Sequence, residues 1–192
     1  MDFFDSAYAG TPPWDIGRPQ KEFVQLVRSG EITGSVLDIG CGTGEHALFF
    51  AGEGYDVWGI DSAPLAIQKA KEKAAIRGLH VHFLIQNALD LSRLNRKFDT
   101  VTDSGFFHTL SDEDRPVFVD NLAAVLFPAG KYFMLCFSEL EPAGYGPRRI
   151  TQTEIRDSFR DGWYINYIRP AVFESRTRAE GPRAWFSSIS RK

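Results

Sequence analysis

The stretch V-L-D-I-G-C-G-T-G-E, residues 36–45, joins a short apolar run to three closely spaced glycines. An apolar run of this kind that ends on glycines predicts a buried strand followed by a tight turn into a helix. Glycine accepts positive φ angles and lets a ligand approach the backbone closely. The turn is therefore a predicted ligand site at the carboxyl end of a strand.

Predicted strands and helices alternate on both sides of this turn. The apolar patterns and capping residues predict helices at 19–29, 44–54, 62–78, 111–127 and 151–160, with Ser62 and Ser111 as N-caps. They predict strands at 35–40, 55–61, 81–87, 97–104, 131–137, 163–168 and 184–190. Such alternation is typical of an α/β fold, with a mostly parallel sheet covered by helices on both faces. The last two strands have no long helix between them and predict a C-terminal antiparallel hairpin.

Length and composition limit the classes of protein. The chain has 192 residues and a formal net charge of −3, which predicts a single domain, residues 1–192, and no nucleic-acid partner, because basic residues are not concentrated. Cys41 and Cys136 form no C-x-x-C pair, so neither a disulfide nor a metal site is expected. The N-terminus lacks signal-peptide features and no apolar stretch reaches about 18 residues, which predicts a cytoplasmic protein with no membrane insertion.

The glycine turn differs from the common nucleotide-binding loops. When the motif G-x-G-x-x-G is counted from Gly40 and Gly42, its third glycine falls on Glu45. The lysine of a phosphate-binding G-x-x-x-x-G-K-[ST] loop is absent as well. Asp38 precedes the glycines, and its carboxylate would oppose the pyrophosphate of NAD or FAD at a cost of several kcal/mol when desolvated. The turn therefore favours a ligand with positive charge.

Polar side chains end the next two predicted strands. Asp61 lies about twenty residues beyond the glycines, where a carboxylate commonly accepts hydrogen bonds from both ribose hydroxyls. The amide of Asn87 can donate to or accept from the edge of a purine. The sequence thus predicts a ligand that contains a cationic end, a ribose and a base.

These motifs, together with W-G-I-D, Q-N-A-L and F-D-T-V-T-D-S, resemble the class I S-adenosylmethionine (AdoMet) methyltransferases over residues 35–137. The resemblance implies a Rossmann-like, seven-stranded sheet of order 3-2-1-4-5-7-6 and AdoMet as cofactor, with S-adenosylhomocysteine as product. It differs at Asn87, where the family often has Asp. The motifs imply cofactor contacts from Asp38, Gly40, Cys41, Gly42, Thr43, Gly44, Asp61, Ser62, Asn87, Ala88, Leu89, Asp103 and Ser104.

Two further stretches resemble the thiopurine methyltransferase-like branch, which acts on small thiols and heterocycles. They are P-P-W-D-I-G, residues 12–17, and D-S-G-F-F-H-T-L-S-D-E-D-R, residues 103–115. The first implies that residues 1–20 form an arm that closes over the cofactor as a lid. Trp14 would cover the methionine portion, and Gly17 would let the chain turn.

The same resemblance implies a small aromatic or thiol acceptor, methylated at sulfur, nitrogen or oxygen. His108 is expected to line the acceptor pocket and is the candidate for proton removal. Tyr8, Phe107, Phe137, Tyr145 and Arg148 are further candidates for the substrate side. A thiol needs no dedicated base near neutral pH, whereas a phenol would benefit from one.

Several alternatives stay open. A tellurite, selenite or halide methyltransferase would have a small polar pocket, and a non-catalytic AdoMet sensor or partner subunit would have a filled one. No metal site is expected. The protein is expected to be a monomer or a weak homodimer. A macromolecular substrate is disfavoured, because the chain has an acidic balance and no added recognition domain.

Overall fold

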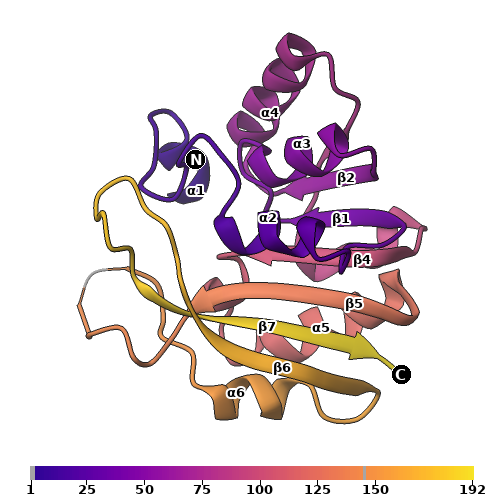
Figure 1. The fold of residues 1–192 in the computed structure, drawn as a ribbon, viewed down its shortest axis with the longest axis vertical. Helices are drawn as coiled ribbons and strands as arrows, with labels where there is room; N and C mark the ends of the chain where they lie inside the picture. The colour runs from indigo at the N-terminus through magenta and orange to yellow at the C-terminus, as the bar shows by residue number, and fades with distance from the viewer. Residues whose placement is uncertain (1–2, 145) are drawn as a thin grey trace.

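The computed structural model describes residues 3–144 and 146–192. Its centre is a sheet of seven strands in the order β3-β2-β1-β4-β5-β7-β6 (Figure 1). The five strands from β3 to β5 pair in parallel, and β7 runs antiparallel to both β5 and β6. The strands are β1 Ser35–Ile39, β2 Asp56–Asp61, β3 His82–Ile85, β4 Phe98–Ser104, β5 Leu126–Phe137, β6 Trp163–Val172 and β7 Arg183–Arg191. The predicted α/β class, strand order and terminal hairpin are confirmed.

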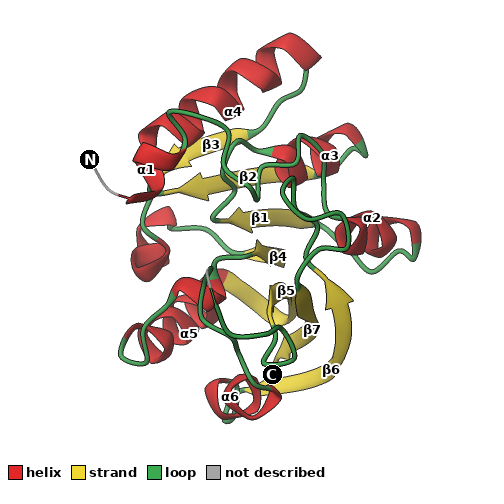
Figure 2. Ribbon diagram, turned by 90° about the vertical axis from the view of Figure 1, so that its left-hand side faces the viewer, coloured by secondary structure: helices red, strands yellow, loops and turns green. Residues whose placement is uncertain are grey.

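Helices cover both faces of this sheet (Figure 2). The α-helices are α1 Phe3–Ala7, α2 Lys21–Arg28, α3 Glu45–Gly52, α4 Pro64–Arg77, α5 Asp114–Val125 and α6 Gln152–Ser158, and the 3-10 turns are η1 Ala88–Leu94 and η2 Phe107–Thr109. On one face α2, α3 and α4 bury Phe23, Phe50 and Ile67 against the sheet. On the other face α5 and α6 bury Phe118 and Ile155. Within the described ranges, every helix is too short or too polar to span a bilayer.

The two predicted N-caps differ from the observed ones. The N-cap of α4 is Ala63 instead of Ser62, because Pro64 with its fixed φ angle takes the first helical position. Helix α5 begins at Asp114, three residues after Ser111, although the Ser111 hydroxyl still accepts a hydrogen bond from the Asp114 N–H at 3.1 Å. Both corrections shift a boundary by a few residues and leave the predicted order of elements unchanged.

The carboxyl ends of the parallel strands meet three other segments of the chain. Helix α1, the loop that follows β5 and the loop between β6 and β7 all lie at this end of the sheet (Figure 1). Glu141, in the loop after β5, is buried and accepts hydrogen bonds from the Arg178 guanidinium and from the Arg183 N–H. This contact joins the two C-terminal loops, so the sheet end is enclosed by segments distant in sequence.

The N-terminal segment, residues 3–20, is docked at both of its ends. Near its start, Lys69 on α4 donates to the carbonyl oxygens of Tyr8 and Gly10 at 2.7 and 2.9 Å. Farther along, Arg18 donates to the Glu174 carboxylate at 2.9 and 3.1 Å. The segment therefore bridges α4 and the β6–β7 loop across the end of the sheet.

Candidate active site

A cavity of about 1100 Å³ lies at the carboxyl end of the parallel strands. Small-molecule sites commonly have about 300 to 1000 Å³, so the volume is sufficient for a cofactor and an acceptor together. Its wall combines the N-terminal segment, the ends of β1 to β4 and both C-terminal loops. The position agrees with the rule that open α/β sheets bind ligands beyond the carboxyl ends of their strands.

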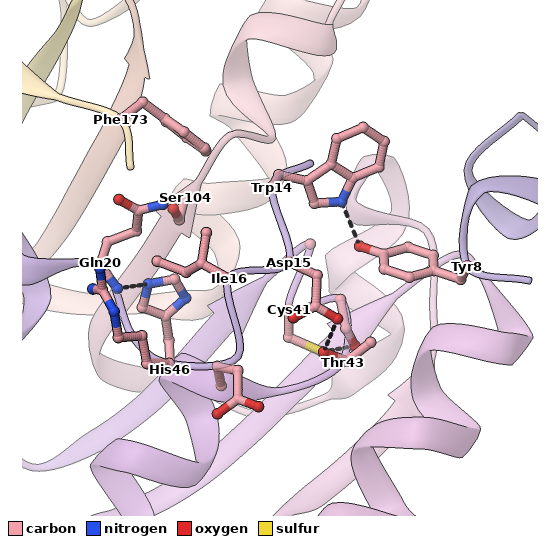
Figure 3. Close-up of a pocket in the computed structure, with 14 residues that line it drawn as sticks. Tyr8, Trp14, Asp15, Ile16, Gln20, Cys41, Thr43, His46, Ser104 and Phe173 are labelled. Atoms are coloured by element: carbon pink, nitrogen blue, oxygen red, sulfur yellow. Dashed lines mark hydrogen bonds between the residues drawn. The ribbon is translucent and has the colours of Figure 1, made fainter. Parts of the chain in front are cut away.

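A second, smaller cavity of about 50 Å³ lies between the N-terminal segment and the glycine turn. Tyr8, Trp14, Gly40, Ser104 and Phe173 line both cavities, so the two share a wall. In Figure 3 the indole of Trp14 is directed toward the Tyr8 hydroxyl, to which its N–H donates at 3.0 Å. The small cavity is therefore an extension of the large one beneath the N-terminal segment.

The glycine turn needs its glycines for both conformation and space. Gly40 and Gly42 have φ angles of 60° and 54°, in the left-handed region that side chains disfavour. A Cβ atom at Gly42 would lie 2.6 Å from the Tyr8 hydroxyl oxygen. The Gly42 N–H donates to the Asp61 carboxylate at 2.9 Å, which fixes the turn to the end of β2. The backbone of Gly40 and Gly42 therefore lines the cavities without a side chain in front of it.

The ends of β2 and β3 present the polar groups expected for a nucleoside. Asp61 lines the large cavity, and burial raises the pKa of its carboxyl, although the N–H groups of Ala63 and Gly42 counteract this shift. The Asn87 Oδ1 accepts a hydrogen bond from the Leu89 N–H at 2.9 Å, so its amide nitrogen is the group left to contact a ligand. The Asp61 carboxylate can accept hydrogen bonds from a ribose, and the Asn87 amide can bond the edge of a purine. The large cavity beside them has space for both groups.

The comparisons with known proteins agree with this geometry. Residues 36–130 match the family described as "Methyltransferase domain". A 2-heptyl-1-hydroxyquinolin-4(1H)-one methyltransferase of Mycobacteroides abscessus is 35% identical over 182 residues, covering 89% of this chain and 80% of the relative. The chain belongs to the AdoMet-dependent methyltransferases. AdoMet is accordingly its cofactor, and the class I fold expected from the sequence is confirmed.

Two other similarities extend over almost the whole methyltransferase. A "Probable thiol methyltransferase 2" of Arabidopsis thaliana is 27% identical and covers 95% of this chain and 80% of its own length. A solved structure from work on "Conversion of a Disulfide Bond into a Thioacetal Group during Echinomycin Biosynthesis" superimposes with a TM-score of 0.90 at 35% identity, covering 98% of this chain and 91% of that chain.

Most residues that the sequence nominated for the cofactor line one of the two cavities of the methyltransferase. They are Trp14, Gly40, Cys41, Gly42, Thr43, Asp61, Ser62, Asn87, Ala88 and Ser104. Gly17, Asp38, Gly44, Leu89 and Asp103 line neither. Gly17 has a φ angle of 72° and lets the N-terminal segment turn, and a Cβ atom at Gly44 would approach Phe83 to 2.7 Å, so this glycine serves packing.

Asp38 and Asp103, the two acidic residues that line neither cavity, lie beneath the glycine turn. Asp38 is buried, accepts a hydrogen bond from the Thr102 hydroxyl at 2.8 Å and has a pKa raised to about 7, chiefly by burial. Asp103 is also buried and accepts from the N–H groups of Phe106 and Phe107 and from the Tyr132 hydroxyl. The expected cofactor contact of Asp103 is therefore corrected: its carboxylate organises the loop after β4.

An aromatic group forms the remaining part of the large cavity. The ring of His108 lies 5.0 Å from that of Phe137 and 6.0 Å from that of Phe173, centroid to centroid. The Arg149 guanidinium lies 5.6 Å above the Phe137 ring. His108, Phe137, Phe173, Arg149 and Phe106 all line the cavity, which gives this part an apolar aromatic wall with a cationic edge.

The environment of His108 does not suit a base. Its Nδ1 accepts a hydrogen bond from the Phe137 N–H at 3.1 Å, so the neutral ring carries its proton on Nε2. Burial and the nearby Arg149 lower the pKa of His108 to about 3. The ring therefore lacks a free lone pair for an acceptor proton, and the expectation of proton removal is not supported by this geometry.

One substrate-side prediction, that of Phe107, is corrected, and those of Tyr8 and Arg148, which line the large cavity, stay predictions. Phe107 is fully buried against Phe118 and Phe159 and does not line the cavity, because the tight turn directs Phe106 outward and Phe107 into the core. Tyr8 lies against the glycine turn, on the cofactor side. Arg148 is at the cavity wall but is paired with Asp112 and Glu154. Tyr145 lies outside the described residues.

The sequence reasoning missed other residues of the wall. Asp15 and Gln20 line the small cavity, and Phe106, Arg149 and Phe173 line the large one. Phe173 directly follows β6 and looks like a core residue in the sequence, and only the antiparallel hairpin brings it beside the end of β4. Nothing in the sequence of the pair Arg148-Arg149 indicates that Arg148 pairs with Asp112 and that Arg149 lies over the Phe137 ring.

Proposed function

We propose that this methyltransferase transfers the methyl group of AdoMet to an oxygen or sulfur atom of a small, planar aromatic molecule. The observation that carries the proposal is the aromatic wall formed by Phe106, His108, Phe137 and Phe173 in the part of the cavity away from Asp61. Flat apolar walls favour aromatic ligands through offset and edge-to-face contacts. The hydroxyquinolone methylated by the Mycobacteroides abscessus relative is a molecule of this kind.

The assigned roles of the residues follow from their positions. AdoMet, when bound, supplies a methyl group activated by its sulfonium, so the protein's task is alignment and exclusion of water. Asp61 and Asn87 hold the nucleoside, and the glycine turn lies beside the methionine portion. The Nε2–H of His108 donates a hydrogen bond to an oxygen or sulfur of the acceptor, while Arg149 favours an acceptor with anionic character.

This assignment removes the need for a general base. A neutral His108 with its proton on Nε2 stabilises an acceptor that is already deprotonated in solution, such as a thiolate or an acidic N-hydroxy group. Ordinary phenols, with a pKa near 10, would react slowly at neutral pH. The site thus favours acceptors whose own pKa lies near or below 8.5, the value of a free thiol.

Residues 1–20 act as the lid in this proposal. Trp14 and Tyr8 cover the boundary between the two cavities, and the contact of Arg18 with Glu174 ties the segment to the β6–β7 loop. The single-domain organisation, cytoplasmic location and monomeric or weakly dimeric state remain predictions.

The test is a labelled-methyl assay with a panel of N-hydroxyquinolones, thiophenols, phenols, N-heterocycles, tellurite, selenite and halides. Transfer to acidic aromatic hydroxyl or thiol groups is expected. Transfer to inorganic anions alone would favour the metalloid or halide alternative, which the phenylalanine lining disfavours. Binding of AdoMet without transfer to any acceptor would favour the sensor alternative, and the open cavity disfavours it.

A further inference from the structure

The small cavity has one carboxylate that the proposed roles do not use. Asp15 lies on the N-terminal segment and lines this cavity with Gly40, Cys41 and Gly42. Its Oδ2 accepts a hydrogen bond from the Thr43 hydroxyl at 2.8 Å (Figure 3). Its Oδ1 accepts one from the Gly17 N–H at 3.3 Å. Each carboxylate oxygen has two lone pairs, so Asp15 retains capacity for a further donor.

The other charged side chains that line this cavity have ion-pair partners. Glu45 forms ion pairs with Lys73 at 2.7 Å and with Arg77 at 3.0 Å. Arg18 is paired with Glu174. In the described part of the chain, by contrast, Asp15 accepts hydrogen bonds from neutral groups alone. The Lys73 ammonium also donates to the Thr43 hydroxyl at 2.7 Å, but the Asp15 carboxylate itself forms no ion pair among the described residues.

Histidine does not supply a positive charge there either. The Nε2 atom of His46 accepts a hydrogen bond from the Gln20 N–H at 3.0 Å, and burial lowers the pKa of His46 to about 4. Both polar ends of the Gln20 side chain are bonded to the backbone of Glu174. A cation is thus the ligand group that this cavity favours, and Asp38, which the sequence suggested for that role, lines neither cavity.

We propose that Asp15 is the carboxylate that receives the ammonium group of the methionine portion of AdoMet. The inference rests on the assignment of the nucleoside to Asp61 and Asn87, which leaves the amino-acid end of the cofactor beside Gly40 and the small cavity. Because Asp15 also bonds Thr43 of the glycine turn, cofactor binding and docking of the N-terminal segment are one coupled event. Asp15 is a specificity residue that selects ligands with the intact amino acid.

The test compares two ligands and two variants by calorimetry without any acceptor. The ligands are S-adenosylhomocysteine and its deaminated analogue, in which hydrogen replaces the ammonium. Asp15→Asn is expected to weaken binding of S-adenosylhomocysteine about tenfold and that of the analogue less than about twofold, as a charge-assisted contact with the ammonium requires. The wild-type protein should itself prefer S-adenosylhomocysteine about tenfold.

Asp5→Asn is the matched control, because Asp5 lies on the same segment and accepts a hydrogen bond from the Leu65 N–H on α4 at 3.0 Å. It removes the same charge from the segment but does not line either cavity. This variant is expected to keep the preference for the ammonium. Equal losses for both ligands in Asp15→Asn would assign Asp15 to docking alone and overturn the proposal, as would no loss for either.

Hydrogen exchange of residues 11–20 gives an independent readout. S-adenosylhomocysteine should slow exchange in this segment of the wild-type protein, whereas the deaminated analogue should slow it less, and Asp15→Asn should abolish the difference. These measurements involve no methyl acceptor, so failure of the proposed acceptor class leaves their outcome unaffected. If the wild-type protein binds both ligands equally, the ammonium has no partner and the inference is wrong.

Discussion

The Nδ1 atom of His108 accepts the backbone N–H of Phe137 at 3.1 Å, so a loop after β4 and the last residue of β5 determine the tautomer of one ring. The ring is buried, and its pKa is lowered to about 3. At neutral pH His108 is therefore a neutral donor through Nε2. This relationship separates a hydrogen-bonding role of His108 from a base role.

His108→Phe should lower kcat/KM for the acceptor about tenfold, because one hydrogen bond of roughly 1.5 kcal/mol is lost. Removal of a true general base would instead lower kcat by about 10² to 10⁴. Steady-state kinetics with a saturating cofactor distinguish the two, and thermal unfolding checks that the variant folds. A loss of kcat beyond about a hundredfold, with a change in the pH profile, would contradict the donor role.

Asp61→Asn should weaken binding of S-adenosylhomocysteine about 10- to 100-fold. The amide loses the charge-assisted hydrogen bonds to a ribose, worth about 1.5 to 3 kcal/mol, and weakens the attachment of Gly42. Calorimetry measures the change. The control is Asp56→Asn at the start of the same strand, where the carboxylate pairs with Arg96 away from the cavities. A dissociation constant within twofold of wild type for Asp61→Asn would exclude Asp61 from the site.

The neighbours Phe106 and Phe107 should respond differently to truncation. Phe107→Ala should reduce the free energy of unfolding by about 3 to 5 kcal/mol, because it leaves a cavity in the core. Phe106→Ala should cost less stability and raise KM for the acceptor, because its half-buried ring lines the large cavity. Denaturant unfolding and acceptor kinetics measure the two effects. The reverse pattern would mean that the turn after β4 has another conformation.

Glu174→Gln should loosen the N-terminal segment. The carboxylate accepts hydrogen bonds from Arg18 and from the Lys21 N–H at 2.9 Å, and its neutral amide would lose about 1 kcal/mol of this attachment. Amide hydrogens of residues 13–21 should then exchange several-fold faster. Glu180→Gln, an exposed residue of the same loop, serves as the control. Unchanged exchange would indicate that the segment is held by its contacts with α4.

Stability should depend on pH through His46. Burial lowers its pKa to about 4, so the unfolded chain takes up a proton below about pH 6.5 that the folded protein resists. The stabilising contribution is complete above pH 6.5 and is lost as the pH falls toward 4, by about 2 kcal/mol at pH 5. Asp38 and Asp103, whose pKa values are raised to about 7 and about 6, act in the opposite direction, so the pH dependence of the wild-type protein alone does not isolate His46.

The difference between variants isolates the histidine. His46→Gln should be less stable than wild type at pH 8, and this deficit should shrink by about 2 kcal/mol at pH 5. Urea unfolding at both pH values measures it. A deficit that is constant with pH would mean that His46 titrates similarly in the folded and unfolded states.

Local patterns were sufficient to predict the parallel sheet and the cofactor. The glycine turn and Asp61 belong to short motifs at strand ends, and parallel pairing brings such ends together, so spacing along the chain predicts proximity in space. Helix boundaries were less predictable: Pro64 displaced the N-cap of α4, because a proline's fixed φ angle outweighs a serine cap one residue earlier.

The acceptor side could be derived only in part: the sequence nominated His108 and Phe137, which line the large cavity, but not Phe106 or Phe173. Phe106 and Phe107 are identical neighbours, and the hydrogen bonds from both N–H groups to Asp103 decide which ring enters the core. The approach of Phe173 to His108 joins residues 65 positions apart through the β6–β7 hairpin. The sequence by itself thus determined the α/β sheet, its methyltransferase motifs and the cofactor, because these depend on local patterns. Tertiary structure alone decided which aromatic rings, and which carboxylate of the N-terminal segment, face the cavities, because those positions depend on contacts between distant segments.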